Sequence, residues 1–145
     1  MLEDNMLEDN KTLVRRYYQE AMDGLSGIDA VVAADFVDHH FPPDLPPGPA
    51  GVRQFFTQLL GGIFSEMRIE IDYLLAEGDL VDCHFALFAK HTGEFAGIAP
   101  RGNAIRCPAI STFRIAEGKL AEAWEIFDSG DLLRQMQQTV RLPCG

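Results

Sequence analysis

Hydrophobic residues in the first part of the chain recur every three or four positions, the spacing of an amphipathic helix. The pattern predicts a helix from Leu7 to about Gly24, carried by the apolar side chains Leu13, Val14, Tyr17, Tyr18, Ala21 and Met22. It predicts a second short helix over 28–34 and a third over 50–60. Residues 36–40 are expected to be extended. The proline-rich stretch 41–51 is expected to be a loop, since proline lacks a backbone donor and restricts the residue before it.

In the second part of the chain the period changes to two, which is typical of strands with one buried face. Apolar and charged residues alternate over 67–73, and further strands are predicted over 81–89, 105–115 and 120–127. The glycine-bearing segments 77–79 and 117–119 are each short enough to close a hairpin. A last helix is predicted over 129–138.

Helices followed by hairpin-linked strands indicate an α+β fold rather than alternating βαβ units. We therefore expect one domain over 1–145, in which a curved antiparallel sheet wraps around three N-terminal helices. This arrangement is a cone-shaped α+β barrel with a pocket at its open end. The segment 1–5 is repeated as 6–10, which is too short for a structural repeat, and we interpret 1–10 as a flexible or artefactual segment.

The charge of the chain narrows the class of partner. Its formal net charge is -10, and an acidic protein is repelled by nucleic acid and by anionic membrane surfaces. No apolar run approaches the ~20 residues that cross a bilayer, and the acidic N-terminus lacks the basic and apolar regions of a signal peptide. The expected location is cytoplasmic, and the expected partner is a small molecule.

Metal and cofactor signatures are missing from the sequence. The cysteines Cys83, Cys107 and Cys144 lie far apart, and we interpret them as two buried strand residues and one tail residue. His39 and His40 are adjacent, so on a strand they point to opposite faces and cannot ligate one metal ion together. The chain has no glycine-rich phosphate-binding fingerprint. We expect neither a metal nor an organic cofactor.

Asp128 is the first candidate for chemistry. A period of two places Trp124, Ile126 and Asp128 on one face of the last strand. A carboxyl on an apolar, aromatic face loses hydration, which raises its pKa and suits it to proton exchange near neutral pH. The alternative is that Asp128 caps the helix predicted directly after it, and capping would lower its pKa instead.

His91 is the second candidate. If the register of its strand holds, it shares a face with the apolar residues of 81–87. A histidine there can shuttle a proton or hydrogen-bond a carbonyl group, or it can simply be a strand-end histidine with its own partners.

Three segments of the chain together resemble the SnoaL-like polyketide cyclases. Residues 90–102, Lys-His-Thr-Gly-Glu-Phe-Ala-Gly-Ile-Ala-Pro-Arg-Gly, are similar to the family's His-x-Gly-x-Phe…Pro-Thr-Gly signature. The ending is also similar, with Glu122, Trp124 and Asp128 followed by Leu-Leu-x-Gln. Val37-Asp38-His39 resembles the family's Asp-His element before a proline-rich loop. The resemblance extends from about residue 13 to residue 138.

The resemblance implies a cone-shaped homodimer that catalyses an intramolecular aldol condensation without a cofactor. It implies that Asp128 is the acid/base and that His39, His91 and Trp124 line the pocket, and we add Tyr17 as a substrate contact. The implied substrate is apolar or polyketide-like. Arg101 stands where the family has threonine, which leaves the substrate open. A related isomerase that acts next to a carbonyl group is equally consistent with these residues. The alternatives are a lipophilic binding module, or a hydroxylase or epoxide hydrolase on the same fold.

Overall fold

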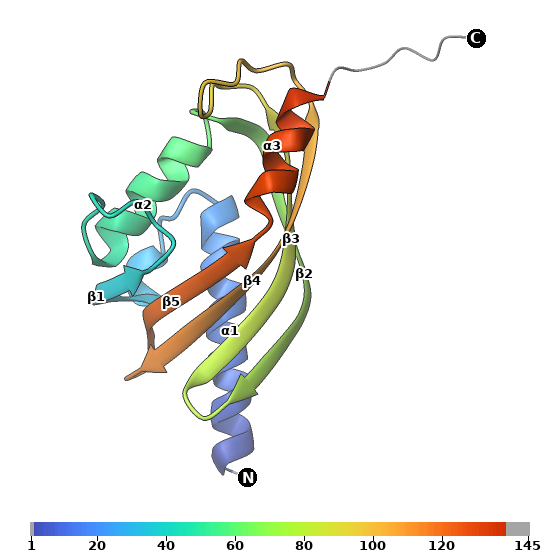
Figure 1. Cartoon of the computed structure of the whole chain (residues 1–145). Helices are drawn as coiled ribbons and strands as arrows, with labels where there is room; N and C mark the ends of the chain where they lie inside the picture. The colour runs from blue at the N-terminus through green and yellow to red at the C-terminus, as the bar shows by residue number, and fades with distance from the viewer. Residues whose placement is uncertain (1, 139–145) are drawn as a thin grey trace.

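The computed structural model describes residues 2–138, which form a five-stranded curved sheet with helices on its concave side and at one end (Figure 1). In chain order the elements are α1 (Leu2–Met22), the short 3-10 helix η1 (Ile28–Ala30), β1 (Val32–Asp38), α2 (Gly48–Leu59), β2 (Phe64–Glu77), β3 (Leu80–His91), β4 (Ala104–Ala116), β5 (Lys119–Phe127) and α3 (Ser129–Gln137). The predicted α+β cone is confirmed, and residues 2–10 of the repeated N-terminal segment belong to α1.

The sheet has the strand order β1-β5-β4-β3-β2, and two details differ from expectation. β1 pairs with β5 in parallel, so the sheet is mixed rather than wholly antiparallel. The helix predicted over 28–34 is a single 3-10 turn, after which Val32 starts β1. Valine is branched at Cβ and has few accessible χ1 rotamers, so it favours strands over helices. This preference agrees with the start of a strand at Val32.

The main core lies between the concave face of the sheet, α1 and α2. Val14, Tyr17, Tyr18 and Ala21 are the buried residues of α1, which recur at the spacing that the sequence predicted. The rings of Tyr17 and Tyr18 contact Phe113 of β4 edge-on, with centroids 5.3 and 5.9 Å away. This packing fixes both tyrosines against the sheet, next to the site described below.

A smaller core closes the other end of the cone beneath α3, where Leu132 and Met136 pack with Phe64, Ala89 and Ile105. The C-terminal carbonyls of α3 are held by side chains from the β3–β4 connection. The Asn103 amide donates to the carbonyls of Gln135 and Gln138 at 3.0 and 2.7 Å, and Arg101 donates to that of Gln137 at 2.7 Å. Arg101 therefore helps to hold the C-terminal end of α3 against the β3–β4 connection.

An irregularity in β5 decides which of its residues face inward. Arg114 pairs with Glu122 and Ile115 with Leu120, so β5 has one extra residue at this point. Such a bulge reverses the alternation of a strand. Leu120 and Ala123 are both buried, although three positions separate them, whereas Trp124 and Ile126 are exposed on the outer face.

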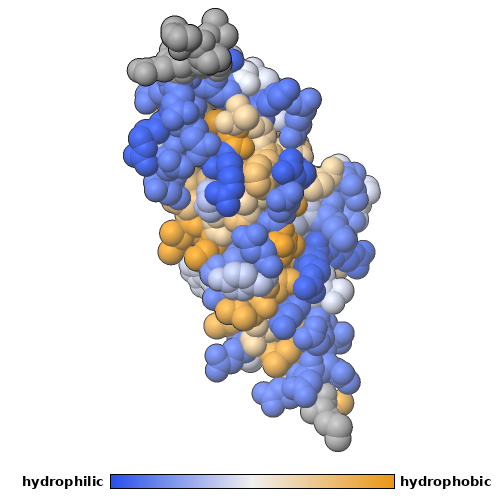
Figure 2. Space-filling view, turned by 90° about the vertical axis from the view of Figure 1, so that its right-hand side faces the viewer, coloured by the Kyte–Doolittle hydropathy of each residue, from blue (hydrophilic) through white to orange (hydrophobic). Residues whose placement is uncertain are grey.

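The outer face of the sheet carries many exposed apolar side chains. Examples from separate strands are Tyr73, Ile110 and Ile126, which are 50%, 42% and 78% exposed. Figure 2 views the molecule from the side of β2 and β3 and shows hydrophobic patches between hydrophilic rims. Within residues 2–138, no helix combines the length and the apolar character needed to cross a membrane.

Candidate active site

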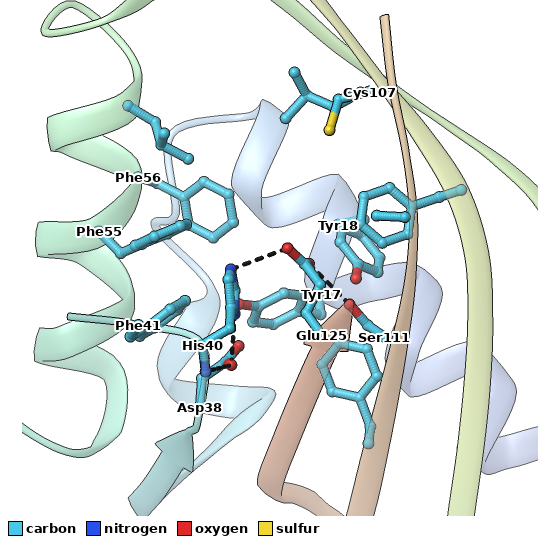
Figure 3. A pocket seen from close by; sticks show the side chains of 15 residues that line it. Tyr17, Tyr18, Asp38, His40, Phe41, Phe55, Phe56, Cys107, Ser111 and Glu125 are labelled. Carbon is cyan, nitrogen blue, oxygen red and sulfur yellow. Dashed lines mark hydrogen bonds and ion pairs between the residues drawn. The ribbon is translucent and has the colours of Figure 1, made fainter. Parts of the chain in front are cut away.

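An apolar cavity of about 70 Å³ opens between α1, α2 and the inner face of β3, β4 and β5 (Figure 3). Aromatic rings supply most of its wall, and its polar groups gather on one side. It is lined by Tyr17, Tyr18, Asp38, His40, Phe41, Phe55, Phe56, Leu59, Phe85, Leu87, Cys107, Ala109, Ser111, Phe113 and Glu125. A cavity with this composition suits a small apolar compound with a few polar atoms.

The pairing of β5 with its two neighbours brings the polar groups together. Ser111 of β4 is the direct cross-strand partner of Glu125, so both side chains stand on the same face of the sheet. On the other side of β5, Asp38 of β1 is aligned in parallel with Ala123. His40 comes two residues after Asp38, and Glu125 comes two residues after Ala123, so that His40 lies beside Glu125.

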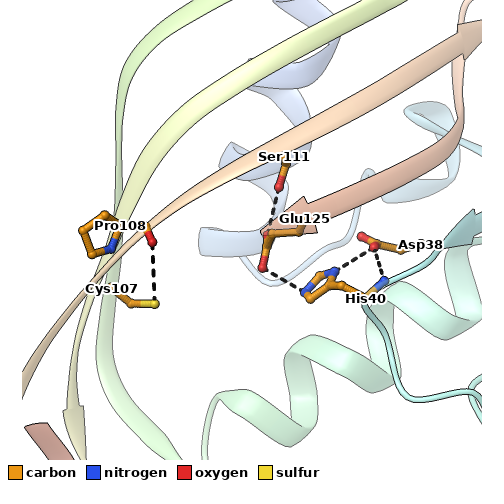
Figure 4. Close-up of polar contacts among 6 residues, drawn as sticks. All are labelled: Asp38, His40, Cys107, Pro108, Ser111 and Glu125. Atoms are coloured by element: carbon orange, nitrogen blue, oxygen red, sulfur yellow. Dashed lines mark hydrogen bonds and ion pairs between the residues drawn. The ribbon is translucent and has the colours of Figure 1, made fainter. Parts of the chain in front are cut away.

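Three hydrogen bonds link these groups into a chain (Figure 4). The Ser111 hydroxyl donates to Glu125 Oε1 at 2.9 Å, and His40 Nε2 lies 3.0 Å from Glu125 Oε2. His40 Nδ1 lies 2.7 Å from Asp38 Oδ1, which also accepts the backbone N–H of His40 at 3.1 Å. Asp38 thus fixes both the turn after β1 and the orientation of the imidazole ring.

The two carboxylates determine the protonation state of His40. Burial by itself would lower the pKa of His40, but the hydrogen bonds to Asp38 and Glu125, together with their negative charges, raise it to about 10. His40 is therefore an imidazolium at neutral pH, and each of its ring nitrogens donates to one carboxylate. Its ring is also packed against Phe41 and Phe55, with centroids 5.1 and 5.2 Å away.

Two phenols complete the polar side of the cavity. Burial, and then the charges of Asp38 and Glu125, raise the pKa of Tyr17 well above 10.0. Burial is the main influence that raises the pKa of Tyr18, and the charge of Glu125 acts in the same direction. Both tyrosines therefore stay neutral and keep an O–H that can donate to a bound oxygen atom.

This arrangement favours proton transfer over metal binding. A protonated histidine has no lone pair for a metal ion, and both nitrogens of His40 are engaged by carboxylates. Within residues 2–138, no three His, Cys, Asp or Glu side chains are grouped so that they could hold one. Cys83 and Cys107 are free, and Cys144 lies outside the described residues. The cavity thus combines two carboxylates, an imidazolium and neutral phenols.

Of the two placements predicted for Asp128, the structure shows the helix cap. It follows the end of β5 as the N-cap of α3, and its carboxylate accepts the backbone N–H of Asp131 at 2.9 Å. The side chain is exposed, so the expectation that it faces the interior is wrong. The bulge in β5 is the physical reason, because it turns the face of Trp124 and Ile126 outward.

The remaining predicted residues are divided between several places. Tyr17 lines the cavity as expected. His91 lies on the inner face of β3 and is fully buried, but it borders the smaller core, and neither ring nitrogen has a partner among the described residues. His39 and Trp124 stack on each other on the outer face, with centroids 5.3 Å apart, away from the cavity. The structure thus does not bring His91, His39 or Trp124 together with Asp128.

The sequence analysis did not single out Asp38, His40, Ser111 or Glu125 as candidates for the chemistry of this site. A signal for Glu125 exists, because it is a carboxylate on the opposite face of β5 from Trp124 and Ile126. It was not recognised because the more apolar face of an isolated strand is normally assigned to the core. Here that face is the outer one.

The fold and the cavity define a class, the cone-shaped α+β proteins that enclose a small-molecule pocket. Within that class, the family model described as SnoaL-like polyketide cyclase matches residues 12–136, and the chain belongs to this family. Membership confirms the resemblance seen in the sequence. It does not assign a substrate or a catalytic residue to this chain.

Solved structures with the same fold include proteins from several Streptomyces species. TsrD from Streptomyces laurentii has a TM-score of 0.80 at 20% identity, over 90% of this chain and 96% of its own. IdmH from Streptomyces antibioticus, a candidate polyketide cyclase, gives 0.74 at 24% over 89% and 99%. AclR from Streptomyces galilaeus, a candidate hydroxylase, gives 0.71 at 23% over 92% and 99%. Curated proteins give no significant match.

Proposed function

We propose that this protein is an acid/base enzyme that closes a ring in a small carbonyl compound by intramolecular aldol addition. The observation that carries the proposal is the buried hydrogen-bonded chain Asp38–His40–Glu125 in the wall of an apolar cavity. In it a carboxylate and an imidazolium lie side by side and mostly buried, which supports the roles of base and proton donor. Both are needed when a carbon next to a carbonyl group loses its proton.

Glu125 is the proposed base. Its Oε1 is bonded by Ser111 and its Oε2 by His40. Each oxygen keeps a further lone pair that is free to take a proton from carbon. The proton moves to the carboxylate, and its electron pair forms the enolate. The enolate carbon then attacks a second carbonyl carbon of the same molecule, and the resulting alkoxide takes up the proton that Glu125 received, which regenerates the carboxylate. The reaction therefore needs no oxidant or reductant.

His40 and Tyr17 are the proposed partners of the developing negative charge. The imidazolium of His40 is held by Asp38 and can stabilise an enolate or alkoxide oxygen. Tyr17 remains a phenol, and the structure gives its hydroxyl no hydrogen-bond partner among the described residues, so it can donate to that oxygen. Preorganised donors of this kind are usually a large part of catalysis.

The test is hydrogen–deuterium exchange at carbon. 2,4-Pentanedione is small, carries an acidic CH2 group between two carbonyls, and can be followed by proton NMR in D2O. The wild-type protein should accelerate the exchange, and Glu125→Gln should lower that acceleration by roughly 10²- to 10⁴-fold. Glu122→Gln, on the outer face of the same strand, is the matched control and should exchange like the wild type. Equal rates for Glu125→Gln and the wild type would refute the proposal.

A binding module is the second candidate, and one observation favours it. Apart from Tyr17, the polar groups of the cavity already have protein partners, as expected of a site that only holds an apolar guest. The two functions differ in the same experiment. A module should bind small ketones without accelerating exchange, and its affinity should be unchanged in Glu125→Gln.

Two further expectations remain proposals. The exposed apolar residues on the outer face of the sheet support a homodimer in which two such faces pack together, because large apolar surfaces are rarely left wet. Proton transfer by Asp128 or His91 is still untested, but their positions give it less support than Glu125 and His40 receive.

A further inference from the structure

Ser111 has a relation to Glu125 that the aldol reaction does not require. Its hydroxyl donates to the carboxylate at 2.9 Å, and the carboxylate is held in turn by the His40 imidazolium, which Asp38 orients. A nucleophile in contact with a base, with the base oriented by a third group, is the general signature of covalent catalysis. Ser111 also lines the cavity, so a small ligand can reach it.

We propose that Ser111 is a nucleophile toward small activated esters and thioesters, with Glu125 as its base. This inference rests on the proposed function only in taking Glu125 as the working base of the cavity. It adds a second kind of reaction, acyl transfer, to the site. It also names a class of acyl donor, one whose acyl group is about as small as acetyl and fits beside the aromatic wall.

The acyl transfer needs only Ser111, Glu125 and the acyl donor. Ser111 Oγ attacks the carbonyl carbon of the donor while its proton passes to Glu125. The tetrahedral intermediate collapses and breaks the bond to the alcohol or thiol, which leaves with a proton from Glu125. The acyl group remains on Ser111 until water or another acceptor removes it, and nothing is oxidised or reduced.

Tyr18 is placed to stabilise the intermediate. Figure 3 shows its hydroxyl beside that of Ser111, on the polar side of the cavity. Because burial is the main influence and keeps the phenol neutral, Tyr18 has an O–H to offer to the oxyanion. A carboxylate is a weak base for a hydroxyl group, which is why we restrict the donors to those with a good leaving group.

Peptide mapping by mass spectrometry tests this directly. Protein is incubated with p-nitrophenyl acetate, quenched in acid and digested. The wild type should gain one acetyl group on the peptide that contains Ser111, and fragmentation should place it on Ser111 itself. Glu125→Gln should lower the rate of labelling at least tenfold, and Ser111→Ala should lose the label from that peptide.

Two further variants serve as controls for this experiment. Thr112→Ala is the matched control, because Thr112 is the next residue of β4 but bonds Asp82 away from the cavity, and it should be labelled like the wild type. Ser111→Cys keeps a nucleophile at the position and should still be labelled if Ser111→Ala fails to fold. A label that maps elsewhere, no label on Ser111, or a rate unchanged in Glu125→Gln would overturn the inference.

The inference and the proposed function can fail separately. Exchange at carbon that depends on Glu125, without labelling of Ser111, would leave Ser111 as a group that only orients the base. Labelling of Ser111 without exchange at carbon would instead support acyl transfer and remove the aldol reaction.

Discussion

Two neighbouring histidines, one on each side of the sheet, each contact a glutamate of β5. On the outer side His39 Nε2 lies 2.6 Å from Glu122, and on the inner side His40 Nε2 lies 3.0 Å from Glu125. The outer contact is shorter, yet 46% of the His39 side chain is exposed, against 17% of His40. The inner histidine also has a second carboxylate, Asp38, of which only 5% is exposed.

The difference shows that burial, more than contact distance, gives a charged pair its chemical properties. Water and salt screen the outer pair, and exposed ion pairs contribute little to stability. The inner pair is shielded, so its charges act strongly on each other and on the phenols around them. The same two residue types therefore serve as a surface contact on one side and as a reactive site on the other.

Removing the inner histidine should have the largest effect. His40→Ala leaves Asp38 and Glu125 as buried carboxylates without their shared cation, and breaking a buried charged network of this kind costs about 3–5 kcal/mol. His39→Ala should leave the free energy of unfolding close to that of the wild type. Urea unfolding at pH 7 measures both, and equal losses in the two variants would erase the contrast between the faces.

The pH dependence of stability sharpens the same comparison. The pKa of His40 is about 10 in the folded protein and near 6.5 in an unfolded chain, so the folded state holds this proton more tightly. The contribution of His40 to the free energy of unfolding is fully present below pH 6.5. It is lost as the pH rises from 6.5 to about 10, and the free energy of unfolding then falls by an amount on the order of a few kcal/mol.

The measurement is the urea midpoint of the wild type and of His40→Gln across that pH range. The difference between the two proteins removes the contributions of other titrating groups, and it should shrink as the pH rises. A difference that stays constant up to pH 10 would mean that the inner carboxylates do not hold the proton.

A change on the outer face should affect assembly and leave the cavity as it is. Ile126 is 78% exposed, and Ile126→Asp would place a charge in the proposed contact between two sheets. Light scattering at micromolar concentration should report a dimer for the wild type and a monomer for the variant, with exchange at carbon retained by both. A wild-type protein that is already monomeric would disprove the proposed interface.

The smallest effect on stability is expected at Asp128, which follows the end of β5. Asp128→Ala removes the side-chain cap of α3 and should cost about 1 kcal/mol, whereas Asp128→Asn keeps an oxygen that can cap and should cost less. Both variants should retain exchange at carbon. Loss of exchange in a folded Asp128→Asn protein would return the acid/base role to this residue and contradict the assignment to Glu125.

The sequence was sufficient for most of the secondary structure, because local spacing carries that information, but the helix predicted over 28–34 includes the start of β1. The alternation that begins near Met67 and the hairpin turn at 117–119 both appear in the structure, and α3 begins at Ser129 as expected. The family followed from motifs spread along the chain, and the match over residues 12–136 confirms it. These features depend on the order of residue types and on short-range geometry.

The residues that meet in the cavity were decided only by the tertiary structure. One extra residue in β5 reversed its alternation, so that Glu125 faces inward and the apolar Trp124 and Ile126 face outward. The parallel pairing of β1 with β5 then set His40, rather than His39, beside Glu125. Neither the bulge nor the pairing of β1 with β5 can be recognised from the local sequence, because both are determined by packing across the sheet.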